Sequence, residues 1–186
     1  VKKKKKKYME GYVTKIHQAS SKRIDAFCSH FGICGGCKWQ NLPYEEQLYY
    51  KEKQVADNLE RIGKVDISCI KPIIASPETI YYRNKLEYSF SDSRWLTENE
   101  VKSNKDIHDR RALGFHIPGK FDRILHIDKC YLQNDYTNLI RNAIGEFTKE
   151  KGYSYSNPYN HEGLMRNIIV RNTTLGEWML IVVFRN

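Results

Sequence analysis

The sequence predicts an α+β fold, in which an antiparallel sheet is combined with two main helices and a cysteine-bearing loop. Three observations predict it: stretches of period-two alternation follow one another in hairpins, two longer stretches show helical spacing, and three cysteines fall within ten residues. Strands joined in hairpins favour an α+β arrangement over a doubly wound sheet. A 40% share of hydrophobic residues and thirteen tyrosines indicate a folded chain rather than a disordered one.

The first third of the chain is expected to hold a strand and a helix on either side of the cysteine loop. Residues 8–17 have the β-branched and aromatic density of a strand, which starts as if the rest of a small sheet were missing. Pro43 opens a helix that runs to about Ile62, with Gly63 as its stop. Its apolar stripe, which we expect to pack near the cysteine loop, comprises Leu48, Val55, Leu59 and Ile62.

A strand is predicted over 81–91, where residues alternate between two faces. One face carries Tyr82, Asn84, Leu86, Tyr88 and Phe90. Residues 93–111 are polar and charged and predict a long loop. Residues 112–117 and 123–127 then predict a hairpin around a Pro-Gly turn.

The last part of the chain predicts a helix followed by two strands. The helix covers about 135–151 and ends at Gly152. Its predicted inner face comprises Leu139, Ile140, Ala143, Ile144 and Phe147. Strands are predicted over 165–172 and 178–184, with a turn at 174–177. The second of these is so apolar that we expect a core strand, and its abrupt end suggests an excised fragment.

A cysteine triplet, Cys28-x5-Cys34-Gly-Gly-Cys37, and the distant Cys130 form the most informative motif. Thiolates that converge from three near positions and one far position are able to hold an iron–sulfur cluster, because each iron needs a soft anionic ligand. Four thiolates also suit a tetrahedral zinc site, although zinc ligands usually come as two close pairs. From the spacing alone, iron–sulfur and zinc both remain open. The two glycines of the triplet are expected to let the backbone bend tightly.

Disulfides are the third alternative for the cysteines. The chain starts with a lysine run and no apolar stretch after it, so no signal peptide is indicated and a cytoplasmic location is expected. Disulfides are uncommon in that compartment, and five cysteines is an odd number. Cys69 lies among apolar residues and is predicted to be a buried structural thiol. His30, inside the cysteine loop, is expected to form a loop-stabilising hydrogen bond rather than to ligate a metal.

The net charge of +9 favours a polyanionic partner. Six of those charges come from the lysine run at 2–7, for which a solvated or disordered tail is the alternative. No stretch approaches the roughly eighteen apolar residues that span a bilayer, so no membrane partner is expected. We expect a monomer.

Several further motifs accompany the cysteines in a fixed order. After Cys28-x5-Cys34-Gly-Gly-Cys37-x2-Gln40 come Tyr44, Gln47-Leu48, Tyr82-Arg83-Asn84-Lys85, Gly114-Phe115-His116 and Cys130-x-Leu132-Gln133. This order resembles the S-adenosylmethionine-dependent RNA (uracil-5-)-methyltransferases that modify 23S ribosomal RNA. The resemblance covers nearly the whole chain, and its cysteine box is the specific part.

The resemblance implies a ligand set, a substrate and a domain organisation. In that family four cysteines bind a [4Fe–4S] cluster, which carries over to Cys28, Cys34, Cys37 and Cys130. Related enzymes that act on transfer RNA generally lack the cysteine box, so 23S ribosomal RNA is the expected partner. Residues 1–20 resemble the end of a TRAM β-barrel, and residues 21–186 resemble the central cluster domain.

The catalytic part of that family has no counterpart in this sequence. There is no Gly-rich strand-to-helix turn for S-adenosylmethionine, no Pro-Cys or Cys-Asn-Pro nucleophile box and no Asp-Pro-Pro-Arg segment. The full enzyme would add a cysteine thiolate to uracil C6, methylate C5 and remove the C5 proton. No catalytic residue is assigned here, and we expect the 186 residues alone to be unable to methylate.

The remaining candidates are residues that would contact RNA. Cations along a strand are able to contact successive phosphates, and aromatic rings are able to stack on unpaired bases. The candidates are Arg83, Lys85, Trp39, Phe115 and Arg166, with Tyr81 and Arg171 on the same grounds. A solvent-facing strand for the cations and core packing for the aromatics are the alternatives. A different class of function, a free-standing iron–sulfur or zinc protein such as an electron carrier, also remains open.

Overall fold

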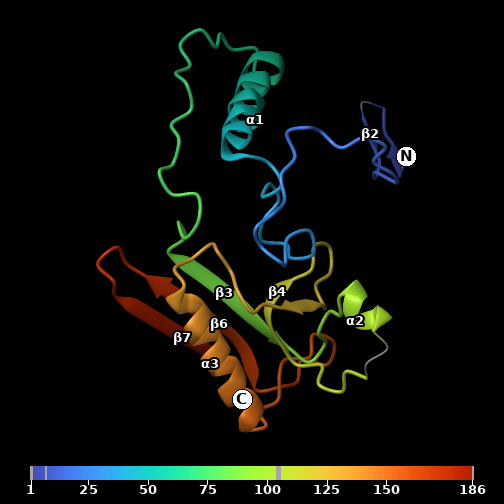
Figure 1. Cartoon of the computed structure of the whole chain (residues 1–186), viewed down its shortest axis with the longest axis vertical. Coiled ribbons are helices and arrows are strands. Elements are labelled where there is room, and N and C mark those ends of the chain that lie inside the picture. Colours follow the sequence, from blue (N-terminus) through green and yellow to red (C-terminus); the bar gives the residue numbers. More distant parts are fainter. Residues whose placement is uncertain (1, 7, 104–105, 186) are drawn as a thin grey trace.

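A five-stranded antiparallel sheet in the order β5-β4-β3-β6-β7 occupies the lower half of the molecule as drawn in Figure 1. The computed structural model describes residues 2–6, 8–103 and 106–185. The strands are β3 (Lys85–Ser91), β4 (Ala112–His116), β5 (Ile124–His126), β6 (Met165–Asn172) and β7 (Trp178–Phe184). The α+β fold with an antiparallel sheet is thereby confirmed, and the bounds of β6 and β7 match those expected.

The alternation of the central strand β3 produces the core. Leu86, Tyr88 and Phe90 are at most 4% exposed, whereas Lys85 and Glu87, which alternate with them, face solvent. Because side chains alternate between the two faces of a strand, one face of β3 is buried along its whole length. Antiparallel pairing places Phe90 opposite Leu113 of β4, next to this buried face.

The strand β7 lies at the edge of the sheet, and its prediction as a core strand is wrong. Its side chains Met179 and Phe184 are 56% and 55% exposed, and Val182 is the residue of β7 that packs against the core. Among the described residues no further strand pairs with its outer edge. Apolar composition therefore identified the strand but not its place in the sheet.

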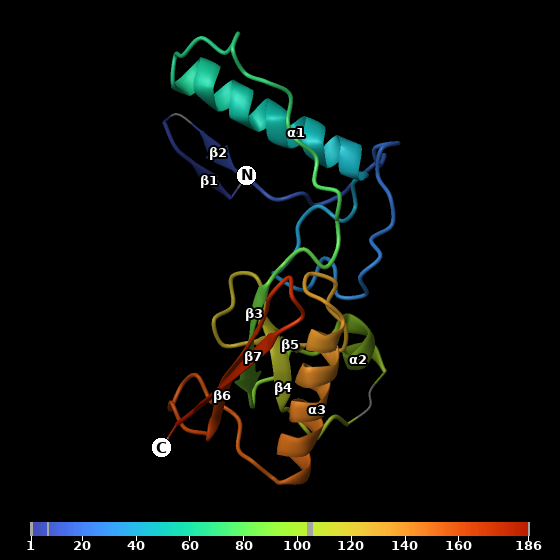
Figure 2. The ribbon, with the colours of Figure 1, turned by 90° about the vertical axis from the view of Figure 1, so that its left-hand side faces the viewer.

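The helix α3 (Tyr136–Glu150) runs along one face of the sheet with the opposite side inward from the one predicted (Figures 1 and 2). Of the predicted inner residues, Leu139 and Phe147 are 64% and 50% exposed, and Ile144 alone packs against the core. The buried side instead comprises Thr137, Asn138, Arg141, Gly145 and Thr148. Some of these side chains have polar partners, and the Thr148 hydroxyl lies 2.7 Å from the Tyr155 hydroxyl, whereas the buried Thr137 hydroxyl has no hydrogen-bond partner among the described residues.

The helix α1 (Tyr44–Asp57) continues as the π-helical turn η1 (Asn58–Ile62) and ends at Gly63, as predicted apart from the change of helix type. It projects away from the sheet (Figure 2). No residue of α1 or η1 is buried, and Val55 and Ile62 of the predicted stripe are 53% and 79% exposed. Its first turns are nevertheless bonded to the preceding loop, because the Gln47 amide donates to the carbonyls of Trp39 and Leu42.

Two local elements differ from the sequence-based expectation. The strand expected over 8–17 is reduced to β2 (Met9–Glu10), which pairs with β1 (Lys3–Lys4) inside the lysine run. All four residues are exposed, so no core extends the pairing. The loop expected over 93–111 contains a short helix, α2 (Glu98–Lys102), which starts with a Thr97–Glu100 capping box. None of the described helices has the length and apolar character needed to cross a bilayer.

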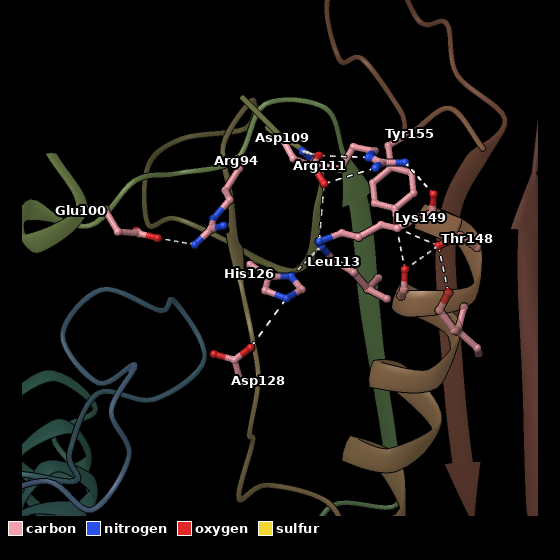
Figure 3. Close-up of polar contacts among 12 residues, drawn as sticks. Arg94, Glu100, Asp109, Arg111, Leu113, His126, Asp128, Thr148, Lys149 and Tyr155 are labelled. Atoms are coloured by element: carbon pink, nitrogen blue, oxygen red, sulfur yellow. Dashed lines mark hydrogen bonds and ion pairs between the residues drawn. The ribbon is translucent and has the colours of Figure 1, made fainter. Parts of the chain in front are cut away.

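Polar contacts link β4, β5 and α3 at the edge of the core (Figure 3). The Leu113 N–H donates to Nδ1 of His126 over 3.2 Å, and the other ring nitrogen lies 3.6 Å from the Asp128 carboxylate. Burial and, secondarily, the Lys149 charge lower the pKa of His126, against an opposing effect of Asp128. The ring is therefore held neutral as a hydrogen-bond acceptor.

Stability should fall as the pH drops below about 6.5, the ordinary pKa of histidine, because the unfolded chain then takes up a proton that folded His126 resists. The substitution His126→Asn keeps an acceptor but does not titrate, so the free energy of unfolding between pH 7 and 5 should have a smaller slope. Chemical denaturation at several pH values measures it. The control, His108→Asn, changes a side chain that is 84% exposed and should leave the slope unchanged; equal slopes in all three proteins would contradict the assignment.

Candidate metal centre

Four cysteines from two distant parts of the chain line one cavity. Cys28, Cys34 and Cys37 come from the loop before α1, and Cys130 comes from the segment between β5 and α3. The cavity holds about 360 Å³ of empty space, part of it open to solvent. All five cysteines of the chain are free thiols. Within the described residues, no three Cys, His, Asp or Glu side chains are grouped as ligands of a single metal ion. Ligation by the four cysteines therefore stays a prediction.

The cysteine loop owes its shape to backbone turns. The Phe31 N–H donates to the Cys28 carbonyl over 3.0 Å, and the Cys34 N–H donates to the His30 carbonyl over 2.8 Å. The Cys28 N–H donates to the side chain of Gln40, which closes the loop from its other end. These bonds fix the backbone that carries the first two cysteines.

The loop is attached to the sheet domain by packing and by one histidine. Ile33, Cys34 and Cys37 pack against the hydrophobic core. Gly35 and Gly36 lie in a turn, as expected, and a Cβ at Gly35 would lie 3.0 Å from the His116 carbonyl oxygen, so this glycine also serves a close approach of two backbones. Nε2 of His30 accepts a hydrogen bond from the Asp128 N–H over 3.3 Å, which confirms the predicted structural role.

The Cys130 segment is fixed by the side chain of Asn138 from α3. Its Oδ1 accepts from the Cys130 N–H over 2.8 Å, and its Nδ2 donates to the Cys130 carbonyl over 3.0 Å. Downstream of Cys130, the carbonyls of Tyr131 and Leu132 accept from the N–H groups of Tyr81 and Arg83. Cys130 thus lies on a strand-like segment bonded to α3 on one side and to the entry of β3 on the other.

Asn138 and Arg141 are the residues of this centre that the sequence does not indicate. They lie three positions apart on α3, so they share a face of the helix. One feature of the sequence could have indicated them: Asn138 and Arg141 follow Cys130 by eight and eleven positions and lie on the side of the helix opposite its apolar stripe. A prediction that considers only the spacing of apolar residues expects that side of the helix to face solvent.

Burial sets the protonation of the cysteines. It raises the pKa of Cys34 to about 11, although the Gly36 N–H, 3.3 Å from the sulfur, acts in the opposite direction. It also raises the pKa of Cys130. Both thiols are protonated at neutral pH without a metal, so binding of a metal group would release protons.

Cys69 is exposed, and its prediction as a buried thiol is wrong. It lies in the irregular segment between η1 and β3, where the neighbouring Ile70 is 37% and Ile74 is 93% exposed. Apolar neighbours in the sequence therefore do not bury this thiol. Cys69 is therefore separate from the four-cysteine cavity.

A second, larger hollow lies next to the cysteine cavity and shares Gly36, Cys37, Gln40, Tyr131 and Leu132 with it. It contains about 1380 Å³ of empty space, including open solvent. Aromatic rings and two lysines are among the residues that line it: Phe27, Trp39, Tyr82, Tyr131, Lys38 and Lys51. The predicted RNA-contacting residue Trp39 thus belongs to a concave surface.

The other predicted RNA-contacting residues are dispersed. Arg83 and Lys85 are exposed, and Lys85 lies 3.7 Å from the Glu87 carboxylate. Phe115 packs on the Tyr88 ring, with 4.8 Å between the centroids, and lines the cysteine cavity. Arg166 donates to the Ser156 hydroxyl and to the His161 carbonyl. RNA contact by these residues stays a prediction.

The chain is similar to proteins named as RNA methyltransferases. It is 51% identical over 183 residues to an uncharacterized RNA methyltransferase of Bacteroides thetaiotaomicron, and 46% identical over 187 residues to one of Porphyromonas gingivalis. Each match covers 98% of this chain and 40% of the relative. The chain therefore spans about 40% of the length of these curated relatives. No protein-family model matches it.

The fold is shared with a solved enzyme. The crystal structure of Pyrococcus abyssi tRNA (uracil-54, C5)-methyltransferase in complex with S-adenosyl-L-homocysteine matches with a TM-score of 0.62 and 24% sequence identity. The match covers 92% of this chain and 34% of that one. At this identity the likeness establishes the fold.

Replacing Asn138 by alanine should lower the free energy of unfolding by about 2–3 kcal/mol, because it leaves the buried N–H and carbonyl of Cys130 without partners. Chemical denaturation of the metal-free chain measures this loss. The neighbouring Leu139→Ala, at a side chain 64% exposed, serves as control and should change stability by less than about 0.5 kcal/mol. Equal effects of the two substitutions would show that Asn138 does not hold the Cys130 segment.

Proposed function

We propose that this chain is the cluster-binding and RNA-contacting part of an S-adenosylmethionine-dependent methyltransferase that forms 5-methyluridine in 23S ribosomal RNA. One observation carries the proposal: four thiols from two distant segments line a single cavity in a chain homologous to RNA methyltransferases. The proposed location is the cytoplasm, and the proposed domain organisation is a TRAM-like end over 1–20 followed by a cluster domain over 21–186.

The thiols around this cavity fit a [4Fe–4S] cluster. A single zinc ion holds its sulfurs at about 2.3 Å and so brings them to within about 3.8 Å of one another. A four-iron cluster places one thiolate on each iron, so its ligands surround a body of some volume. Cys28, Cys34, Cys37 and Cys130 line one cavity and so offer one thiol to each iron, which supports the second arrangement.

The role proposed for the cluster is structural. Methyl transfer to a uracil is polar chemistry and needs no electron transfer, whereas four metal–thiolate bonds would cross-link the cysteine loop to the sheet domain. Cys130 is separated from Cys37 by 92 residues, and closing so long a loop restricts the unfolded chain strongly. The bound group would thus hold the loop, and with it the wall of the larger hollow, in place.

The larger hollow is the proposed RNA-contacting surface. Unpaired bases are commonly recognised by stacking on aromatic rings, and Trp39 and Tyr82 offer such rings beside Lys38 and Lys51. Arg83 and Lys85, which are exposed and follow Tyr82 in the sequence, would contact phosphates. The choice of 23S ribosomal RNA rests on the cysteine box, which related transfer-RNA enzymes generally lack.

Catalysis is assigned to the part of the longer relatives that this chain does not span. The 186 residues contain no S-adenosylmethionine motif and no nucleophile box, and the relatives are about two and a half times as long. In the proposed enzyme this chain therefore holds and orients RNA, while methyl transfer takes place elsewhere.

Anaerobic reconstitution with iron and sulfide should load about four irons and four sulfides per chain. Replacing Cys37 by serine should abolish loading, because it removes one of four thiolate ligands. Cys69→Ser is the matched control: its thiol is exposed and separate from the cavity, so loading should be complete. Iron and sulfide analysis with the visible spectrum measures both. Zinc without iron in the purified wild-type chain, or full loading of Cys37→Ser, would contradict the cluster.

The chain should bind a 23S ribosomal RNA fragment more tightly at low salt, and more tightly than a transfer RNA of similar length. Lys51→Gln should reduce the slope of log affinity against log salt by about 0.7, the contribution of one phosphate contact to single-stranded RNA. Trp39→Ala should weaken binding without changing that slope. Lys102→Gln, in α2 at a side chain 75% exposed, is the control for loss of charge alone. Salt-independent binding, or equal effects of Lys51→Gln and Lys102→Gln, would contradict this surface.

A further inference from the structure

Arg141 is a fully buried cation whose partners are all uncharged. Its side chain is 1% exposed. Nη1 donates to the Asn138 side-chain oxygen over 2.8 Å and to the Tyr88 hydroxyl over 3.3 Å. The other donors reach the Asn142 side chain, over 3.0 and 3.2 Å, and the Asp128 carbonyl. Across the described ranges, no carboxylate forms an ion pair with this guanidinium.

Such an arrangement is unfavourable unless a negative charge lies nearby. Removing an ionised group from water costs several kcal/mol, and hydrogen bonds to neutral oxygens satisfy its donors without neutralising its charge. A guanidinium stays protonated in proteins, so Arg141 is unable to avoid the cost by losing its proton. Arg141 is thus a buried positive charge with no directly paired carboxylate: Asp135 accepts from Nδ2 of Asn138 over 2.7 Å, but its side chain is 59% exposed and lies 3.7 Å from Lys129.

The four-cysteine cavity is the place where the balancing charge would lie. Arg141 and the Cys130 N–H share one acceptor, Oδ1 of Asn138, so a single side chain connects the guanidinium to the Cys130 backbone. The guanidinium also lies 5.0 Å from the centroid of the Tyr88 ring, and that ring packs on Phe115, which lines the cavity. Arg141 is thus a buried side chain that a single residue, Asn138, separates from the Cys130 backbone.

We propose that Arg141 is the buried counter-cation of the cluster held by the four cysteines, and that it positions Cys130 through Asn138. The inference rests on the proposed cluster. Four thiolates carry more negative charge than the oxidised iron–sulfide core carries positive charge, so the loaded centre is an anion and becomes more negative when it gains an electron. A fixed positive charge in a region of low dielectric stabilises both forms, and the reduced form more strongly.

Lys129 provides a matched comparison on the same cavity. It lines the cavity, but its side chain is 47% exposed and lies 3.7 Å from the Asp135 carboxylate. Water and dissolved ions screen an exposed charge far more than a buried one. Arg141 should therefore change the reduction potential of the cluster more than Lys129 does, and the effect of Arg141 should depend less on the salt concentration.

The test is the reduction potential of the reconstituted chain in four forms: wild type, Arg141→Gln, Arg141→Lys and Lys129→Gln. The potential of Arg141→Gln should shift to more negative values and should stay shifted at about 1 M salt. Lys129→Gln should shift less, and its shift should vanish at that salt concentration. Arg141→Lys keeps the charge and should remain close to wild type. Arg141→Met replaces Arg141→Gln if the latter fails to fold, because its unbranched side chain fills similar space.

Two results would overturn the proposal: an unchanged potential in the neutral variants, or a shift in Arg141→Lys as large as theirs. A neutral variant that folds but takes up no iron, while Arg141→Lys loads and keeps the wild-type potential, supports it. If the neutral variants do not fold, Arg141→Lys decides alone: the wild-type potential supports the counter-cation, and a shifted potential overturns it. Failure of the wild-type chain to bind iron would instead contradict the cluster itself, so the two claims fail by different observations.

Discussion

The buried polar contact between α3 and the Cys130 segment is the interaction on which the cysteine centre depends. Asn138 bonds both backbone groups of Cys130, and Arg141 bonds Asn138 from behind. This contact fixes the one cysteine that belongs to the sheet domain. The cysteine loop then docks on it through His30 and through the packing of Ile33.

The same contact explains the unusual orientation of α3. A helix on a sheet normally turns its apolar stripe inward, because burial of apolar surface stabilises the fold. Here the inward side carries Asn138, Arg141 and Thr148, and each has a hydrogen-bonding partner, whereas Leu139 and Phe147 remain exposed. The need to satisfy the Cys130 segment and Tyr155 decides the rotation of the helix, at the expense of apolar burial.

Local sequence patterns predicted which residues form the strands, but they did not predict which elements pack against one another. The alternation of Leu86, Tyr88 and Phe90 and the turn at 174–177 identify strands because they depend on residues close in sequence. The buried side of α3, the edge position of β7 and the exposure of Cys69 depend on which elements meet, and composition does not report that.

A capping box at Thr97 could have revealed α2. The four cysteines were grouped by spacing and resemblance, and the structure brings them to one cavity across 92 intervening residues.

The cysteine loop with its helix and the sheet domain are thus two parts of the chain that a metal–thiolate centre would join. Hydrogen–deuterium exchange of the chain before and after anaerobic loading with iron and sulfide tests this most directly. Amides of residues 28–37 and of 128–133 should become protected together, because both carry ligands of one group. Unchanged exchange in both segments, or protection of 28–37 without 128–133, would contradict a shared centre.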